Sequence, residues 1–318
     1  MKLQTQIPLQ KQEQQMEYNS KLLLLGSCFA ENIGKKFDYF KFQTIQNPFG
    51  ILFHPKAIET LISHAMGGSP YVEKDVFLHN EQWHCYDAHS KLSDVSKERL
   101  LQKLNAGLKN TKKQILEATH IVITLGTAWV YDLAESGKTV ANCHKVQQKH
   151  FNKKLLTIDA ITKSLQNAMD AIRSVNEDAF IVLTVSPVRH IKDGFVENTQ
   201  SKSHLISAIH ALTSSMSESV NLSYFPSYEI MLDELRDYRF YKPDMLHPNE
   251  TAIDYIWDKF KCVWIEEEAQ ETMNEVAVVQ KGITHKPFNA KSEAHLKFLQ
   301  GLEQKKQALQ SKFPHIAF

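Results

Sequence analysis

The sequence predicts an α/β fold in which helices cover both faces of a parallel sheet. Three runs of apolar residues have the length of buried strands, at 22–25, 120–126 and 180–185. Segments with a helical apolar repeat separate the runs, at about 55–65, 94–117 and 157–175. Strands that alternate with helices typically form a parallel sheet, and near-continuous apolar strands fit burial on both faces.

The first apolar run leads directly into a turn and a helix. Gly26, Ser27 and Cys28 follow the leucines, and apolar residues then recur at every fourth position. Ser27 therefore stands at the carboxyl end of a strand, the edge where open α/β sheets bind their ligands. The alternative is that Ser27 only caps the helix, because serine is a favoured N-cap residue.

The rest of the chain fits the same alternation. The other expected elements are a strand at 42–45, an excursion with a hairpin at 75–89, a long polar loop at 129–156, a helix at 199–219, a short strand at 222–225 and a helix from about 253. Loops as long as 129–156 inside a compact domain are usually functional or disordered.

Composition changes divide the chain into three parts. Residues 1–20 are polar and rich in glutamine, which predicts an extended arm, and residues 21–265 form the α/β domain. Residues 266–318 are rich in Glu, Gln and Lys, and leucines at helical spacing predict an amphipathic helix there. This helix either docks on the main domain or joins a second subunit, so a homo-oligomer is one expectation.

Composition and charge exclude several classes of function. The 318 residues include 37 Lys and Arg against 36 Asp and Glu, so charge favours neither nucleic acid nor an anionic membrane as a partner. No apolar run is long enough to span a membrane. The chain has neither a phosphate-binding loop nor a dinucleotide fingerprint, and its His and Cys spacings match no zinc motif. We expect no cofactor and no metal.

The four cysteines and the N-terminal segment indicate a cytoplasmic protein. Cys28, Cys85, Cys143 and Cys262 are far apart in the sequence and form no CxxC pair, which is typical of free thiols in a reducing compartment. The first residues contain no apolar segment suited to a signal peptide.

A second group of reactive residues lies near the end of the α/β domain. Asp244 and His247 stand three residues apart, just before the last expected helix of the domain. A serine hydroxyl is a weak nucleophile that needs a neighbouring base, and histidine serves if a carboxylate fixes its tautomer. The alternative is a surface loop in which Pro248 opens the helix.

These motifs together resemble the GSCFA family, which is named for the string at residues 26–30. The resemblance covers about residues 20–265. Its further motifs stand at 47–50, 125–127, 141–145, 186–188 and 244–248. The family is grouped with SGNH/GDSL-type hydrolases, which implies a flavodoxin-like, three-layer α/β/α fold and ester hydrolysis, often of acylated carbohydrates or lipids.

The resemblance implies roles for four residues. Ser27 would be the nucleophile, His247 the base and Asp244 its orienting partner, and Gly50 falls where the clan places an oxyanion glycine. One departure is Ala128, which stands where the clan has an asparagine that completes the oxyanion hole. Loss of one such donor typically costs about 10²–10³ in rate.

Several residues could replace that asparagine or contact the substrate. The preferred replacements are Asn142 and His144, although each could be an ordinary loop residue. Asn47 and Thr127 are weaker candidates. Arg189 and His190 follow the strand at 180–185 and could contact an anionic or carbohydrate substrate, or lie in a solvated loop or salt bridge. Cys28 is an alternative nucleophile, but packing is its expected role.

The sequence thus predicts a serine esterase or acyl hydrolase that acts on an O-acyl ester through an acyl-enzyme. The expected substrate is a small-molecule or carbohydrate ester, with acetylated carbohydrate as one candidate. If a sugar hydroxyl replaced water, the same site would be an acyltransferase. The alternative from another class is a non-catalytic module that binds carbohydrate or another ligand on the same fold.

Overall fold

A five-stranded parallel sheet forms the centre of the computed structural model, which describes residues 4–215 and 221–318. Its strands, in spatial order, are β10 (Leu222–Phe225), β9 (Phe180–Val185), β5 (His120–Leu125), β1 (Lys21–Gly26) and β2 (Gln43–Gln46). Read from β2 and counted along the chain, this is the order 2-1-3-4-5 of flavodoxin-like folds. The predicted parallel α/β sheet is confirmed.

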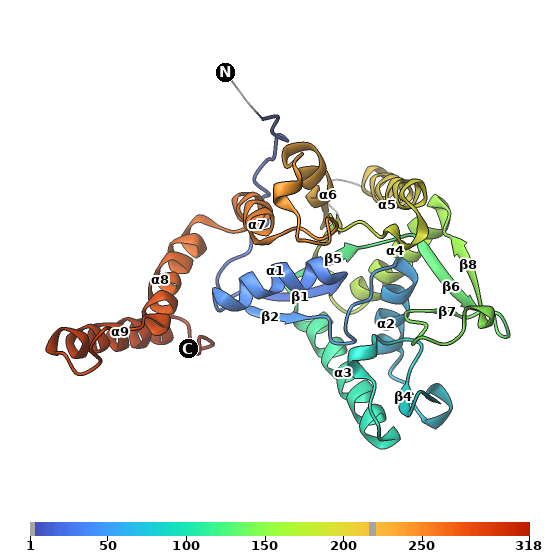
Figure 1. Cartoon of the computed structure of the whole chain (residues 1–318), viewed down its shortest axis with the longest axis horizontal. Coiled ribbons are helices and arrows are strands. Elements are labelled where there is room, and N and C mark those ends of the chain that lie inside the picture. Colours follow the sequence, from blue (N-terminus) through green and yellow to red (C-terminus); the bar gives the residue numbers. More distant parts are fainter. Residues whose placement is uncertain (1–3, 216–220) are drawn as a thin grey trace.

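Helices cover both faces of the sheet, and two more extend beyond it (Figure 1). They are α1 (Cys28–Tyr39), α2 (Pro55–Gly67), α3 (Lys97–Glu117), α4 (Ile158–Arg173), α5 (Phe195–Ser215), α6 (Ser227–Glu229), α7 (Glu250–Trp264), α8 (Glu267–Thr284) and α9 (Glu293–Lys312). Helix α5 begins before the predicted 199–219, and residues 216–219 of that prediction lie outside the described residues.

The alternating side chains of the strands build one core on each face of the sheet. Leu23 and Leu25 of β1 pack with α2, α3, α4 and α5, whereas Leu22 and Leu24 pack with α1 and α7. Successive residues of a strand point to opposite faces, so a strand covered on both sides is apolar throughout. This is why the short apolar runs were a reliable signal for the sheet.

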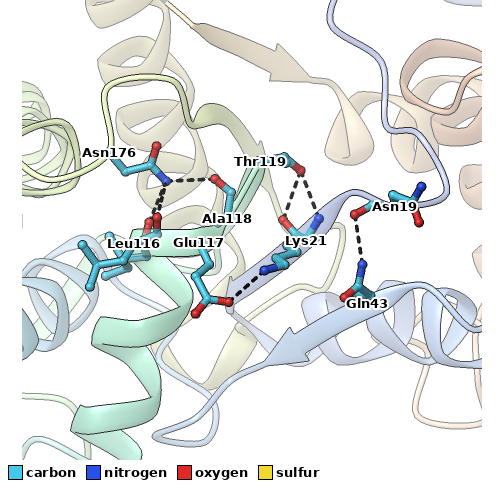
Figure 2. Close-up of polar contacts among 9 residues, drawn as sticks. Asn19, Lys21, Gln43, Leu116, Glu117, Ala118, Thr119 and Asn176 are labelled. Atoms are coloured by element: carbon cyan, nitrogen blue, oxygen red, sulfur yellow. Dashed lines mark hydrogen bonds and ion pairs between the residues drawn. The ribbon is translucent and has the colours of Figure 1, made fainter. Parts of the chain in front are cut away.

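Polar contacts join the elements at the amino edge of the sheet (Figure 2). The Lys21 ammonium lies 2.9 Å from the Glu117 carboxylate, and the Thr119 amide donates to the Lys21 carbonyl over 2.9 Å. Asn176 donates from Nδ2 to the Ala118 carbonyl over 2.9 Å, just after α3 ends. These contacts hold the start of β1 against the start of β5, at the edge opposite Ser27.

The segment 129–156 is folded, so the prediction of a long polar loop was wrong. It forms an antiparallel sheet of β7 (Thr139–Val140), β6 (Trp129–Leu133) and β8 (Phe151–Leu155). Buried Val130 and Asp132 alternate with half-buried neighbours, but five residues are too few for this alternation to be recognised. The outer strand β8 is exposed in its middle and reads as polar sequence.

The predicted hairpin within 75–89 is confirmed. Its strands are β3 (Phe77–His79) and β4 (Gln82–His84), paired antiparallel. The two turn residues, Asn80 and Glu81, have φ angles of 46° and 61°. Positive φ at both central residues is typical of the tight turns that suit the twist of a hairpin.

Both ends of the chain contribute to the apolar core on one face of the sheet. Met16 of the N-terminal segment is fully buried, and its amide donates to the carbonyl of Trp264 over 2.6 Å. Helices α8 and α9 extend beyond the sheet (Figure 1), and Phe313, after α9, returns to pack on the Tyr18 ring at 4.6 Å. Exposed Leu296, Phe298 and Leu299 lie on α9. A homo-oligomer formed through this helix stays a prediction. None of the helices within the described ranges is long and apolar enough to cross a membrane.

Candidate active site

Ser27 lies between the end of β1 and the start of α1, at the carboxyl edge of the sheet. Its Oγ accepts a hydrogen bond of 3.2 Å from the Phe29 amide, which makes it the N-cap of α1. Its own amide donates to the Thr124 carbonyl on β5 over 3.0 Å. The residue is 1% exposed. Ser27 therefore does cap the helix, and its role as a nucleophile stays a prediction.

The sharp turn before Ser27 requires glycine at position 26. Gly26 has a φ angle of +130°, and a Cβ there would lie 2.1 Å from the carbonyl oxygen of Thr124. Only glycine tolerates both the backbone angle and this close approach of a neighbouring strand. The turn brings Ser27 against β5.

Asp244 and His247 form a preorganised pair in the loop before α7. The imidazole donates from Nδ1 to the Asp244 carboxylate over 2.6 Å. The other carboxylate oxygen accepts the amides of His247 and Leu246, over 3.0 and 2.9 Å. The hydrogen bonds from these two backbone amides, and then the hydrogen bond from the imidazole, lower the pKa of Asp244 to about 2. A carboxylate bound to Nδ1–H leaves the lone pair of His247 on Nε2, as a general base requires.

The structure does not join this pair to Ser27. Within the described chain, the Ser27 hydroxyl bonds to the Phe29 amide, and the His247 ring bonds to Asp244. The two side chains also differ in exposure, since Ser27 is buried and the His247 side chain is 41% exposed. The hydrogen bond that a Ser-His-Asp triad needs is therefore not formed here.

His190 lies against Gly126, close enough to His247 for the charge of His247 to act on its ring. Its Nε2 would be 3.1 Å from a Cβ on Gly126, the residue that follows β5. This nitrogen is buried and has no hydrogen-bond partner among the described residues. Burial, and then the charges of Lys202, His247 and Lys192, lower the pKa of His190 to about 3. The neutral ring therefore has a free nitrogen at the carboxyl edge of the sheet.

Lys202 of α5 is a buried cation that sequence reasoning missed. Its ammonium donates to the carbonyls of Gly126 and Ser186, both over 2.7 Å, and the residue is 1% exposed. Those carbonyls follow β5 and β9, so one side chain holds two strand ends together. Burial is the main cause that lowers the pKa of Lys202 to about 7, and Arg189 adds to it. Nearby Cys28 acts in the opposite direction.

Asn47 and Gly50 form a turn beside β1. The Asn47 Oδ1 accepts the Gly26 amide over 2.9 Å, whereas its Nδ2 is buried without a partner among the described residues. Gly50 has a φ angle of +71°, and its amide donates to the Asn47 carbonyl over 2.7 Å. The Gly50 amide is thus engaged within the turn, and the free donor here is the Asn47 side chain.

The family model described as "GSCFA family" matches residues 21–260, most of the chain. The chain belongs to the GSCFA family. A second model, described as "GSCFA domain protein, C-terminal domain", matches residues 276–318, which include the second half of α8 and all of α9. The name-giving string of this GSCFA protein covers the end of β1 and the first turn of α1.

The chain was also compared with solved structures and with curated proteins. One similar solved structure is a carbohydrate esterase family 3 protein from Talaromyces cellulolyticus, at 10% identity and a TM-score of 0.34. The match covers 81% of the GSCFA chain and 99% of the fungal chain. The curated proteins include no significant match.

The GSCFA chain fills the place beside Ala128 with a serine of α5. Ala128 is fully buried, and its amide donates to the Ser201 hydroxyl over 2.7 Å. The Thr127 hydroxyl lies 2.9 Å from the same Ser201 oxygen and accepts the amide of Trp129. Both residues therefore connect β5 and β6 to α5, and the contacts of Thr127 are structural.

Asn142 and His144 bond within their own loop and the β3–β4 region. The Asn142 Oδ1 accepts the His144 amide over 2.8 Å, and the His144 Nε2 donates to the Cys85 carbonyl over 2.7 Å. The His144 ring packs on His84 at 4.6 Å, and burial lowers its pKa to about 4. No hydrogen bond within the described ranges links either residue to Ser27 or His247, so their role as oxyanion donors stays a prediction.

Cys28 has the surroundings of a protonated thiol. Burial, and then the carboxylate of Glu31, raise the pKa of Cys28, while Lys202 and Lys242 act in the opposite direction. A raised pKa disfavours the thiolate, which is the nucleophilic form. This agrees with packing as the main role of Cys28.

The helical spacing of apolar residues in α5 could have identified Lys202 as a buried residue. It stands three residues before Leu205 and seven before Ile209, on the buried face of α5. A lysine on an apolar face needs buried partners, which is itself a sign of a special role. Elsewhere in the described chain, no group of three or more His, Cys, Asp or Glu is arranged to hold a metal ion.

Proposed function

We propose that this GSCFA protein is a serine esterase or acyl hydrolase that acts on an O-acyl ester, such as an acetylated carbohydrate. The Asp244–His247 pair supports this most, because a 2.6 Å hydrogen bond holds the imidazole in the tautomer of a general base. The pair lies close to His190, at the edge of the sheet where Ser27 follows β1.

In the proposed reaction, His247 takes the proton of Ser27 through Nε2 while Oγ bonds to the ester carbonyl carbon. Asp244 stabilises the imidazolium that results. The bond from that carbon to the alcohol oxygen then breaks, and the imidazolium returns its proton to the leaving alcohol. Water repeats these steps on the acyl-serine and releases the acid. A sugar hydroxyl in place of water would make the same site an acyltransferase.

The proposal requires Ser27 and His247 to come within hydrogen-bonding distance when substrate binds. Catalytic hydrogen bonds are often long or misaligned without substrate and tighten in the complex. The half-exposed His247 is carried by a loop, whereas Ser27 is held by β1 and α1. We expect the loop to make the adjustment.

The oxyanion needs donors that are free, and the side chains of Asn47 and His190 provide two. Both have a buried nitrogen without a partner within the described part of the chain. Asn47 bonds through Oδ1 to the amide next to Ser27, and the neutral His190 ring lies against Gly126. We propose that these two nitrogens take the place of the clan's asparagine and of the engaged Gly50 amide.

Two conservative variants test these donors. Asn47→Asp keeps the acceptor for Gly26 but removes the Nδ2 donor, and His190→Phe keeps a ring against Phe53 but removes Nε2. Each is expected to lower kcat for 4-nitrophenyl acetate by about 10²–10³, because an oxyanion donor acts mainly in the transition state. The measurement is kcat for 4-nitrophenyl acetate, determined for wild type and both variants under identical conditions.

The exposed His150 supplies the control, and His150→Phe is expected to keep kcat within twofold of wild type. Unchanged kcat in both donor variants would contradict the assigned oxyanion hole. A wild-type protein that binds an acetylated sugar but hydrolyses no ester would be the non-catalytic binding module instead.

A further inference from the structure

A small cavity borders the loop that carries Asp244 and His247. Its volume is about 280 Å³, and its lining includes Arg189, Phe195, Tyr238, Tyr241, Met245 and Leu246. Met245 and Leu246 stand between Asp244 and His247 in the loop, and Arg189 directly precedes His190. The cavity is therefore next to the groups that the proposed reaction uses.

Arg189 is a cation without a counterion in this cavity. The other charged side chains of the lining are Arg236, which pairs with Asp233 over 2.9 Å, and Asp237, which pairs with Arg239 over 3.1 Å. In the part of the chain that the structure describes, the Arg189 guanidinium has neither an ion pair nor a hydrogen bond. A half-buried guanidinium with all five N–H donors free is a ready partner for a planar anion.

The charge of Arg189 reaches the surrounding site. Burial is the main cause that raises the pKa of Tyr241, and Arg189 acts against it. The charge of Arg189 also contributes to the lowered pKa of Lys202. Of these two cations, within the described residues, Arg189 alone has no carbonyl or carboxylate bonded to it.

Aromatic side chains line the same cavity as Arg189. Phe195 is 63% exposed and Tyr238 is 73% exposed, and the Tyr238 and Tyr241 rings lie 5.9 Å apart. Pockets that bind small molecules typically combine aromatic walls with a few charged groups that set orientation. An uncharged acyl ester would leave the Arg189 donors unused.

We propose that Arg189 binds an anionic group, a carboxylate or a phosphate, on the ester substrate of the adjacent site. This inference rests on the proposed function, and it names the class of substrate as O-acyl esters of anionic molecules. The guanidinium binds two oxygens of the anion, the aromatic side chains contact the ring that carries it, and the ester extends toward His247. Specificity then comes from Arg189, since nothing else in the lining offers an unpaired positive charge within the described residues.

Three matched esters test the inference: an acetyl ester of glucose, of glucuronic acid and of glucose 6-phosphate. Wild type is expected to give kcat/KM about 10- to 100-fold higher for an anionic ester than for the neutral one. The charged ester that is preferred distinguishes a carboxylate from a phosphate. In Arg189→Met, we expect the ratio to fall to about one, mainly through KM of the anionic ester, whereas Arg99→Met on the distant α3 keeps the wild-type ratio.

Equal kcat/KM for neutral and anionic esters in wild type, or a preference that survives in Arg189→Met, would overturn the inference. The hydrolase proposal can fail separately. If no ester is hydrolysed, calorimetric titration with glucuronate and glucose 6-phosphate decides: Arg189-dependent binding keeps the anion site without the hydrolase, and no binding of either anion overturns the anion site as well.

Discussion

Ser27→Ala is expected to lower kcat/KM for 4-nitrophenyl acetate by about 10⁴-fold or more, because removal of a triad nucleophile leaves only binding and oxyanion stabilisation. The proposed reaction begins at the Ser27 oxygen, and no other hydroxyl in the described site stands at a strand-to-helix junction beside Thr124. The measurement is initial-rate hydrolysis by purified wild type and variant under identical conditions.

Folding of this variant needs its own check, since Ser27 also caps α1. Loss of a serine N-cap costs about 1 kcal/mol, which leaves a domain of this size folded. The midpoint temperature of thermal unfolding should therefore be modestly lower in Ser27→Ala than in wild type. The neighbouring Cys28→Ala is the matched control and is expected to stay within a few-fold of wild type. Full activity in Ser27→Ala would contradict Ser27 as the nucleophile, and loss of activity only in Cys28→Ala would assign the reaction to the thiol.

Lys202→Met is expected to change how stability depends on pH. In the folded chain the pKa of Lys202 is about 7, whereas an unfolded lysine titrates near about 10.4. Between these values the unfolded chain binds more protons, so the free energy of unfolding of wild type rises with pH, by up to about 1.4 kcal/mol per unit. Below about pH 7 this contribution is lost. The methionine variant should lack it.

The size of the difference also depends on pH. The carbonyls of Gly126 and Ser186 lose their donor in the variant, at about 1–3 kcal/mol each. At pH 10 the neutral amine of wild type still donates without the cost of a buried charge, so the variant is then at its greatest disadvantage. Urea unfolding at pH 7 and pH 10 measures both proteins. Lys163→Met, at an exposed position of α4, should keep the wild-type slope; the same slope in Lys202→Met would contradict the assignment.

The sheet could be predicted from sequence because its strands are apolar on both faces. The residues of β1, β5 and β9 are buried almost without interruption, so these strands show no alternation of apolar and polar residues. The length of each apolar run and the turns that flank it identified them instead. The small sheet of β6, β7 and β8 was not predictable in the same way. Its strands are short and partly exposed, and their pairing depends on contacts between Trp129 and Leu155, far apart in sequence.

The local parts of the candidate site could be predicted, and the distant ones could not. Asp244 and His247 are three residues apart, so their contact follows from one loop. Lys202 bonds to carbonyls 76 and 16 residues away, and Ser201 to an amide 73 residues away. Asn142 was preferred over Asn47 because it stands in the long segment after the strand at 120–126, but the buried unpaired nitrogen belongs to Asn47. Which donor is free depends on three-dimensional packing.

The central claim is that Ser27 is an activated nucleophile, and mapping of a covalent adduct tests it most directly. Wild-type protein treated with a fluorophosphonate is digested, and the modified peptide is identified by mass spectrometry. We predict one adduct on the Ser27 side chain, absent from Ser27→Ala and from His247→Gln but present in Cys28→Ala. An unlabelled wild-type protein, or an adduct on another residue that persists in Ser27→Ala, would contradict the account.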